Sequence, residues 1–519
     1  MSGTLAILTR TALRRDRVLA TVWIWVLLVT CYASAAATPG IYHSVQDRVS
    51  AAQATNDNPA LVALYGPILD VRSVGELSMT KMTALYAVLV ALLFVVLFRR
   101  QTRLDEERGA LELLGGTAAG RHAPSVAAIL EGTLLAAVVG VGAAVVDIAG
   151  KMPLAGSVMF GLAWGGTGLV AVGVAAVAAQ CSASARTCGG IAVGTVVCLY
   201  ALRAFGDTGW VGLSWMSPFG WNTQLRAWSA PRWWVLLLYP LAAALLLAVA
   251  RGLEHRRDLG GGVIPSAPGR ATGPSWLRSC ATLAWRAQRF SLVSWTIAVA
   301  LGGIVIGAVA PGVGKLLKGS GVADMMRRLG GAGAIENTLL AAEIGILALA
   351  ISGFAIGVVT HTAEDERLGI SEEVRATPVR RTAPWGATVL VLTLGSLWLL
   401  VVTGVAAALG AGRAWGPMVG ATLVQAPAIA VTAALTLLIW GVVARYAAYG
   451  WAVLGAFVVM GMVGEVLKLP AWVIGLSPYT HVPKLPAESM TWTSTWVLTV
   501  VVAVIGSVAW FAYRGRDAG

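Results

Sequence analysis

The amino-acid sequence predicts an all-α polytopic membrane protein whose twelve transmembrane helices form two parallel repeats of six spans each. Three observations predict this fold class. Hydrophobic residues make up 57% of the 519 residues and charged residues only 12%, with a mean hydropathy of +0.76, whereas soluble domains carry about 25% charge. The apolar residues form long uninterrupted runs, and the second half of the chain repeats charged motifs of the first half.

The apolar runs are long enough for helices to cross a bilayer. A hydrocarbon core about 30 Å thick needs roughly 20 apolar residues per helix, and runs such as 84–98 and 233–250 are continuous. Barrel strands would instead alternate in hydrophobicity, so of the two structures that satisfy the backbone in lipid, helices are expected. The predicted spans are 19–38, 81–99, 124–148, 155–179, 187–205, 232–251, 292–311, 338–360, 384–410, 417–443, 447–467 and 493–513.

The formal net charge of +13 is explained by membrane topology rather than by a nucleic-acid partner. Basic residues cluster before the first predicted span and after the second and sixth, and loops that remain in the cytoplasm are enriched in Lys and Arg. We therefore expect cytoplasmic N- and C-termini and no binding of nucleic acid. The clustered residues are Arg10, Arg14, Arg15, Arg17, Arg99, Arg100, Arg103, Arg251, His255, Arg256 and Arg257.

An internal repeat divides the chain. At an offset of 260 residues, segment 102–124 aligns with segment 362–384. Because each half has an even number of spans, both halves enter the membrane from the same side and the repeat is parallel. We predict a first six-span repeat at 1–250, a cytoplasmic linker rich in charge, Gly and Pro at 251–276, and a second six-span repeat at 277–519. The same offset places Ser217-Pro218-Phe219 on Ser477-Pro478-Tyr479, and we interpret both as bends of external elements.

Nearer the start of each half the offset is 272, where Arg14, Arg17 and Trp23 align with Arg286, Arg289 and Trp295. Segments 1–18 and 272–291 are thus expected to be matching basic segments at the inner membrane surface. The basic N-terminus, apolar run and residues 33–37 also resemble a cleavable signal peptide. Recurrence of the same pattern in the middle of the chain argues against cleavage.

The stretch RLDEERGALELLGG (103–116) places acidic residues between two apolar runs. As one helix over 104–118, it would have Leu104, Leu111 and Leu114 on one side and Asp105 and Glu112 on nearly the opposite side. A solvated loop that only maintains topology would need positive charge alone. Because the acidic pattern returns 260 residues later, we favour a docking role. The candidate docking residues are Asp105, Glu106, Glu107, Gly109, Glu112, Thr117 and Arg121, with Asp365, Glu366, Gly369, Glu372, Thr377 and Arg381 in the second half.

Two six-span halves, each with a basic N-terminal segment and an acidic helix between its second and third spans, resemble the permeases of ABC-2 type exporters. The closest resemblance is to the fused twelve-span tetronasin-resistance group. It implies that 104–121 and 364–381 are coupling helices and that hydrophobic or amphipathic compounds leave through a bacterial cytoplasmic membrane. The second copy departs from the first: Arg367 stands for Glu107, and Glu373 and Arg375 for Leu113 and Gly115. The two docking surfaces are therefore expected to differ.

The same resemblance implies a motor on a separate chain. A phosphate-binding loop needs G-x-x-x-x-G-K-[ST], and the nearest fragment, PGVGKLL (311–317), lacks both the spacing and the hydroxyl residue. We therefore expect a transport subunit rather than an enzyme, with no cofactor of its own. Two copies of an ABC ATPase, carrying ATP and Mg²⁺, would dock on it. The five cysteines and five histidines show no metal-ligand spacing, so no metal site is expected.

The main alternative is a proton-coupled secondary transporter of the major facilitator type, which also has two parallel six-span halves. Its loop after the second span is compact and basic, unlike the acidic stretch here. Proton coupling needs ionisable groups within the spans. Glu131, Glu343 and Glu465 are candidates, although each lies toward a span end, where a side chain can reach the interface. Phe94 and Phe354, which match at the 260 offset, are candidates for the substrate path, as are Glu131 and Glu343.

Overall fold

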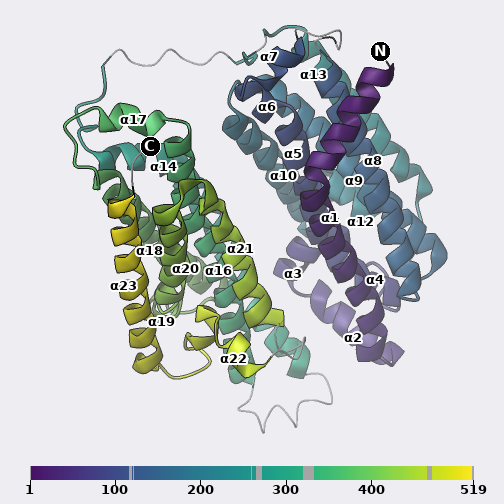
Figure 1. The fold of residues 1–519 in the computed structure, drawn as a ribbon. Coiled ribbons are helices and arrows are strands. Elements are labelled where there is room, and N and C mark those ends of the chain that lie inside the picture. Colours follow the sequence, from purple (N-terminus) through teal and green to yellow (C-terminus); the bar gives the residue numbers. More distant parts are fainter. Residues whose placement is uncertain are drawn as a thin grey trace. The chain divides into compact units, whose positions relative to one another are not determined.

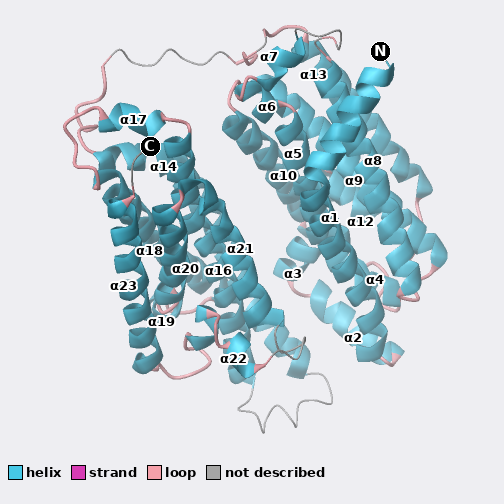
Figure 2. Cartoon of the chain, in the orientation of Figure 1, coloured by secondary structure: helices cyan, strands magenta, loops and turns pink. Residues whose placement is uncertain are grey.

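The computed structural model describes residues 2–115, 120, 122–258, 260–264, 272–318, 332–463 and 470–516. Within these ranges the chain forms helices and connecting segments, with no strand (Figure 2). Eleven of the described helices are long and apolar enough to cross a membrane. The all-helical polytopic prediction is therefore confirmed.

The chain divides into two compact units, Met1–Gly269 and Arg270–Gly519, called unit 1 and unit 2 below. Unit 1 contains six long helices, several short ones, a π-helical turn at Met82–Tyr86 and a 3-10 turn at Trp233–Leu237. Its helices are α1 (Ser2–Ile41), α2 (Val45–Asn56), α3 (Pro59–Tyr65), α4 (Val74–Lys81), α5 (Ala87–Gln101), α6 (Arg103–Glu107), α7 (Ala110–Gly115), α8 (Ala123–Ala149), α9 (Leu154–Cys181), α10 (Ala185–Thr208), α11 (Val211–Trp215), α12 (Pro218–Gln224) and α13 (Leu238–Glu254).

Within its described residues, unit 2 repeats this order with fewer short helices. Its helices are α14 (Cys280–Lys318), α16 (Ala332–Arg367), α17 (Ile370–Arg375), α18 (Ala383–Ala411), α19 (Trp415–Leu423), α20 (Ala426–Val442), α21 (Gly450–Val458), α22 (Ala471–Ile474) and α23 (Trp492–Gly515). Helical turns of 3-10 type lie at Ala444–Tyr449 and Pro478–His481, and a π-helical turn lies at Val459–Val463. Between α19 and α20 the helix is interrupted just before Pro427, which has no backbone N–H to continue it.

The same helix pairs pack in both units. In unit 1, α9 packs against α5, α8, α10 and α13, and α1 packs against α8. The corresponding pairs in unit 2 are α20 with α16, α21 and α23, α19 with α18, and α14 with α18. Small residues allow the closest approach: a Cβ added to Gly161 of α9 would lie 2.3 Å from the carbonyl oxygen of Gly140 of α8. Such contacts are how helices associate without a hydrophobic driving force in lipid.

Basic residues cluster most densely at one end of each unit, called the basic end below. In unit 1 the N-terminus, α6 and α7 lie at the basic end, and α2, α3 and α4 lie at the opposite end (Figure 1). In unit 2, α17 and the C-terminal end of α23 lie at the basic end, and α22 lies at the opposite end (Figure 1).

The basic segments are not separate surface helices. Residues 2–18 belong to the 40-residue helix α1 and residues 280–291 to the 39-residue helix α14. At 1.5 Å per residue, α1 is about 60 Å long, twice the thickness of a hydrocarbon core. Both basic segments therefore continue into the same helix as the span that follows, and their position at the inner membrane surface stays a prediction.

The predicted span 447–467 is the one that the eleven candidate helices do not include. Its described part consists of the end of a 3-10 turn, α21 and the π-helical turn Val459–Val463. Residues 464–467, including the candidate Glu465, lie outside the described residues.

The two Ser-Pro-aromatic motifs each begin a short helical element, and that these elements are external stays a prediction. Ser217 and Ser477 are both fully buried. The Ser217 hydroxyl accepts a hydrogen bond from the Phe219 backbone N–H (3.2 Å), which caps α12, whereas the Ser477 hydroxyl donates to the Phe457 carbonyl (3.3 Å). The Tyr479 hydroxyl lies 2.5 Å from that of Ser352 and 3.0 Å from that of Thr432, and burial raises the pKa of this phenol. The motif of unit 2 thus connects its short element to α16 and α20.

Candidate functional site

The acidic stretch forms a turn at the basic end of unit 1 rather than one helix. Helix α5 ends at Gln101, Thr102 interrupts it with φ −119° and ψ −85°, and α6 ends at Glu107. Gly109 then adopts φ +75°, and α7 begins at Ala110. The prediction of a continuous helix over 104–118 is therefore wrong, because Gly109 occupies the left-handed region that L side chains rarely adopt. We call residues 102–112 the turn of unit 1.

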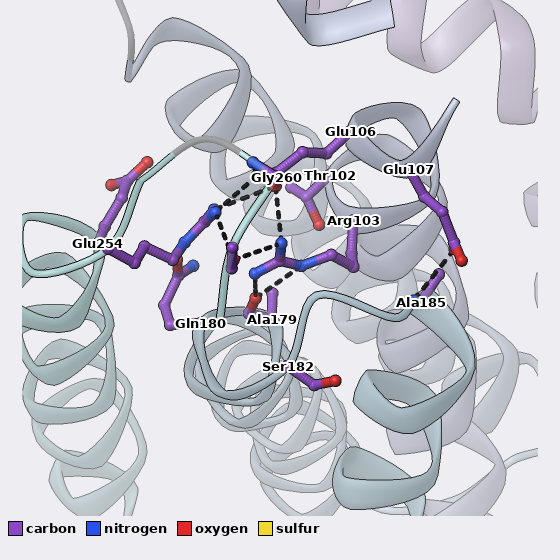
Figure 3. Close-up of polar contacts among 12 residues, drawn as sticks. Thr102, Arg103, Glu106, Glu107, Ala179, Gln180, Ser182, Ala185, Glu254 and Gly260 are labelled. Carbon is purple, nitrogen blue, oxygen red and sulfur yellow. Dashed lines mark hydrogen bonds and ion pairs between the residues drawn. The ribbon is translucent and has the colours of Figure 1, made fainter. Parts of the chain in front are cut away.

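Glu106 points into unit 1 and is held by two arginines (Figure 3). Arg257, just beyond α13, donates from Nη1 to Oε1 (2.6 Å) and from Nη2 to Oε2 (3.1 Å). Arg103 places Nη1 3.2 Å from Oε2, and the Gly260 backbone N–H donates to Oε1 (2.7 Å). Arg103 and Glu106 are only 1% and 9% exposed. A buried carboxylate needs such partners. Glu106 therefore faces into the unit, whereas the sequence predicted a residue that faces a docking partner.

The same cluster reaches the end of α9. The Arg103 side chain donates from Nε to the Ala179 carbonyl oxygen (2.9 Å), and Arg257 Nε donates to Gln180 Oε1 (2.5 Å). The backbone of Val263 donates to the Gln180 carbonyl (2.9 Å), so residues 260–264 are also fixed here. The ends of the second, fourth and sixth long helices of unit 1 thus meet around one carboxylate (Figure 3).

The other acids of this turn differ in environment. Asp105 accepts from Arg15 of α1 (2.6 Å), and the same guanidinium donates to Gln101 Oε1 (2.7 Å). Glu107 accepts from the Ala185 backbone N–H at the start of α10 (3.1 Å) (Figure 3). Glu112 is exposed. Glu112 is therefore the acid of the turn that is most available to another molecule.

Unit 2 contains the same turn at the positions that the repeat predicts. Gly369 has φ +76°. The backbone N–H groups of Gly369 and Glu372 donate to Glu366 and Gly369 (3.2 and 3.0 Å), as those of Gly109 and Glu112 donate to Glu106 and Gly109 (3.0 and 3.2 Å). We call residues 362–372 the turn of unit 2. Here α16 runs without interruption through Arg367.

Glu366 is held in the same way as Glu106. Its carboxylate pairs with Arg516, just beyond α23, and accepts from Trp440 Nε1 near the end of α20 (2.9 Å). Arg516 also donates to the Trp440 carbonyl (2.7 Å). Asp365 lies 3.1 Å from His361 Nδ1, and Glu372 is exposed. An inward-facing acid paired with an arginine and an exposed acid therefore recur in both units, with Glu366 less buried than Glu106.

Of the remaining candidate docking residues, two lie on the surface and two lie outside the described residues. Thr377 and Arg381 are exposed; Thr377 donates to the Val374 carbonyl (2.6 Å) and Arg381 to that of Arg516. Thr117 and Arg121 lie outside the described residues.

The candidates for the substrate path lie within their own units. Phe94 and Phe354 are 0% and 1% exposed in the two hydrophobic cores, each against a glycine (Gly168 and Gly395). Glu131 of α8 is 1% exposed, so its proposed reach toward the interface is wrong. Glu343 of α16 is partly buried. A role of these four residues in transport stays a prediction.

The sequence does not predict the partners of Glu106 and Glu366. Arg103 and Arg257 are explained there as topological charges, and Gln180, Trp440 and Arg516 have no role. One signal was available: an arginine follows the last span of each half at nearly the same offset as the acids. The offset of 260 places Arg256 on Arg516, although the arginine that binds Glu106 is the neighbouring Arg257.

These features define a multi-pass integral membrane protein with a repeated charged turn in each unit. Sequence comparisons then give its family. The model of the C-terminal domain of the multidrug efflux system permease Rv1217c matches residues 277–514. The multidrug efflux system permease protein Rv1217c of Mycobacterium tuberculosis is 35% identical over 529 residues, which cover 99% of this chain and 95% of the relative. The chain belongs to this family of multidrug efflux permeases.

Proposed function

We propose that this chain is the permease subunit of an ATP-driven pump that exports hydrophobic and amphipathic compounds across the bacterial cytoplasmic membrane. The observation that carries the proposal is the repeated turn. Two segments 260 residues apart adopt the same backbone at the basic end of each unit and expose an acid, Glu112 or Glu372. A loop that served only topology would not need a conserved turn geometry and an outward acid in both halves.

The turns are the proposed docking sites of two copies of a separate ABC ATPase. Each ATPase would carry ATP and Mg²⁺, since the chain contains no G-x-x-x-x-G-K-[ST] motif. Both turns and both chain termini then face the cytoplasm, in agreement with the basic residues around them. The name of the Mycobacterium tuberculosis relative supports drugs as substrates.

Docking is tested by charge reversal on the exposed acids. The chain is purified after co-expression with candidate ABC ATPases from its own genome, and the retained ATPase is quantified. Glu112→Lys with Glu372→Lys should release it, because each reversal places a like charge against a basic partner surface. Asp57→Lys with Glu488→Lys is the matched control, since both acids are exposed at the opposite end of their units. Full retention of the ATPase by the Glu112 and Glu372 variant would refute docking at the turns.

A second function, proton-coupled export, is favoured by one specific observation. Helix α8 carries two buried acids, Glu131 and Asp147, whose Oε1 and Oδ2 atoms have no hydrogen-bond partner among the described residues. Ionisable residues within a membrane are usually functional. Inside-out vesicles distinguish the two mechanisms: uptake of a fluorescent drug should require ATP and persist when the pH gradient is dissipated. Uptake driven by the pH gradient without nucleotide, and abolished by Glu131→Gln, would favour the alternative.

A further inference from the structure

Glu106 and Glu366, which face into their units, each link their turn to the end of the last span, which docking does not explain. Glu106 joins the turn of unit 1 to Arg257 beyond α13, and Arg257 in turn holds Gln180 at the end of α9. Glu366 joins the turn of unit 2 to Arg516 beyond α23 and to Trp440 near the end of α20. We call these two clusters the anchors of unit 1 and unit 2.

The anchors occupy equivalent positions but are built from different side chains. The offset of 260 that relates Glu106 to Glu366 also relates Gln180 to Trp440. Gln180 accepts from its arginine through a side-chain oxygen, whereas Trp440 accepts through its carbonyl and donates to the acid through Nε1. Arg103 of unit 1 corresponds to Ala363, which carries no charge. The connection is thus kept in both units although the groups that make it have changed.

The anchor of unit 1 also has a specific geometry. The Glu106 carboxylate receives both nitrogens of Arg257, a bidentate geometry that fixes orientation as well as distance. Removing one partner from a buried pair leaves an uncompensated charge. A displacement of the turn therefore either carries the start of the following segment and the end of α13 with it or has to break the pair.

We propose that Glu106–Arg257 and Glu366–Arg516 are positioning pairs that transmit motion of the turns to the basic ends of the last spans, α13 and α23. This inference rests on the proposed function, because the motion originates in a docked ATPase. It assigns Glu106 and Glu366 a role different from that of Glu112 and Glu372: the exposed acids meet the partner, and the inward-facing acids couple its movement to the helices.

The test separates binding from coupling. The Glu106→Gln and Glu366→Gln double variant is co-expressed with the ATPase and reconstituted in vesicles. Retained ATPase, ATP hydrolysis, and drug transported per ATP hydrolysed are measured. We expect the ATPase to remain bound and active while the transport ratio falls by at least about tenfold, within the 5–150-fold usual for coupling between sites. A merely structural role would lower all three quantities together. Glu112→Gln with Glu372→Gln, the matched control, should instead lower the amount of bound ATPase.

Rescue is tested in unit 2, where no second arginine corresponds to Arg103. Glu366→Arg combined with Arg516→Glu restores opposite charges and should recover most of the ratio lost in Glu366→Gln. If the double glutamine variant fails to fold, Glu366→Gln and this swap decide the question, because the side chains of this pair are 14% and 17% exposed against 5% and 9% in unit 1.

Three results would overturn the inference: an unchanged transport ratio, loss of the ATPase from the glutamine variants, or no recovery in the swap. A wild-type chain that retains no ATPase and transports without nucleotide would instead refute the proposed function itself. That result is measured on the unmodified chain, so it is distinguishable from failure of the inference alone, and it would refute both.

Discussion

The turns of unit 1 and unit 2 share their backbone but not their surroundings. Thr102 and Thr362 are equivalent, yet Thr102 breaks the helix and Thr362 continues it. The difference follows from the next residue: the Arg103 side chain turns inward to the Ala179 carbonyl, whereas Ala363 has no polar group to satisfy. The comparison indicates that the glycine with positive φ and the inward-facing acid determine the turn, whether or not the preceding helix is interrupted.

The exposed surfaces differ more strongly. In unit 1 the turn presents Glu107, Arg108 and Glu112, whereas the equivalent surface in unit 2 includes Leu368 and Ile370, which are 63% and 52% exposed. A retained pairing of acid with arginine beneath a changed surface is expected if that pairing does the same work in both units and each surface meets its partner differently.

The largest expected effect concerns Phe94 and Phe354, which the sequence placed on the substrate path. Each ring lies where a Cβ on the facing glycine would come within 2.5 or 2.6 Å, so each fills a core position. Phe94→Ala and Phe354→Ala should each lower the free energy of unfolding by about 3–5 kcal/mol, measured by denaturation in mixed micelles. Phe205→Ala and Phe290→Ala, at exposed positions, are the controls. Unchanged stability with altered drug selectivity would instead support a position of both residues on the substrate path.

The next effect contrasts the anchors. Glu106→Gln leaves Arg103 and Arg257 close together with no carboxylate between them, and breaking a buried pair costs about 3–5 kcal/mol. Glu366→Gln leaves a single arginine, which is less buried. The loss in free energy of unfolding should therefore approach the roughly 1 kcal/mol of an exposed pair. Denaturation of the purified variants measures the difference, with Glu112→Gln as the control. Equal losses in both units would show that Arg103 adds nothing to the anchor of unit 1.

The sequence predicted the elements of the site better than its connections. The repeat correctly paired Gly109 with Gly369 and Glu106 with Glu366, because identity at fixed spacing survives without knowledge of the fold. It did not predict that the acids turn inward, since Arg257 lies 151 residues beyond Glu106 and already had an explanation as a topological charge. The break at Gly109 was missed for a related reason: apolar spacing continues across it, and a positive φ leaves no mark on periodicity.

The glycines should respond equally. Among the described residues other than the chain neighbours, no atom lies within 4 Å of a Cβ added to Gly109, and at Gly369 the nearest is Glu372 Cδ at 4.0 Å. Gly109→Ala and Gly369→Ala should therefore each cost roughly 1–2 kcal/mol through backbone strain alone, with Asn milder at both positions. Gly190→Ala and Gly357→Ala, which face open space within helices, should instead be neutral or stabilising. A markedly smaller loss at one turn would mean that its backbone can adopt another conformation.

The smallest expected change in stability comes from the surfaces, where the consequence lies in binding. Charged contacts weaken as the screening length falls from about 10 Å at 0.1 M salt to about 3 Å at 1 M, while contacts through Leu368 and Ile370 persist. Raising the salt should therefore release one ATPase copy before the other, which mass measurement of the intact complex can follow.

Exchanging the two surfaces sharpens this prediction. Leu368→Arg with Ile370→Ala gives unit 2 the residues of unit 1 at these two positions and should make both ATPase copies leave over the same salt range. The free energy of unfolding should change by no more than about 0.5 kcal/mol. The reciprocal control, Arg108→Leu with Ala110→Ile, should retain both copies at high salt. Simultaneous release from the unmodified chain would show that the exposed residues do not distinguish the two docking sites, and that the shared backbone alone determines docking.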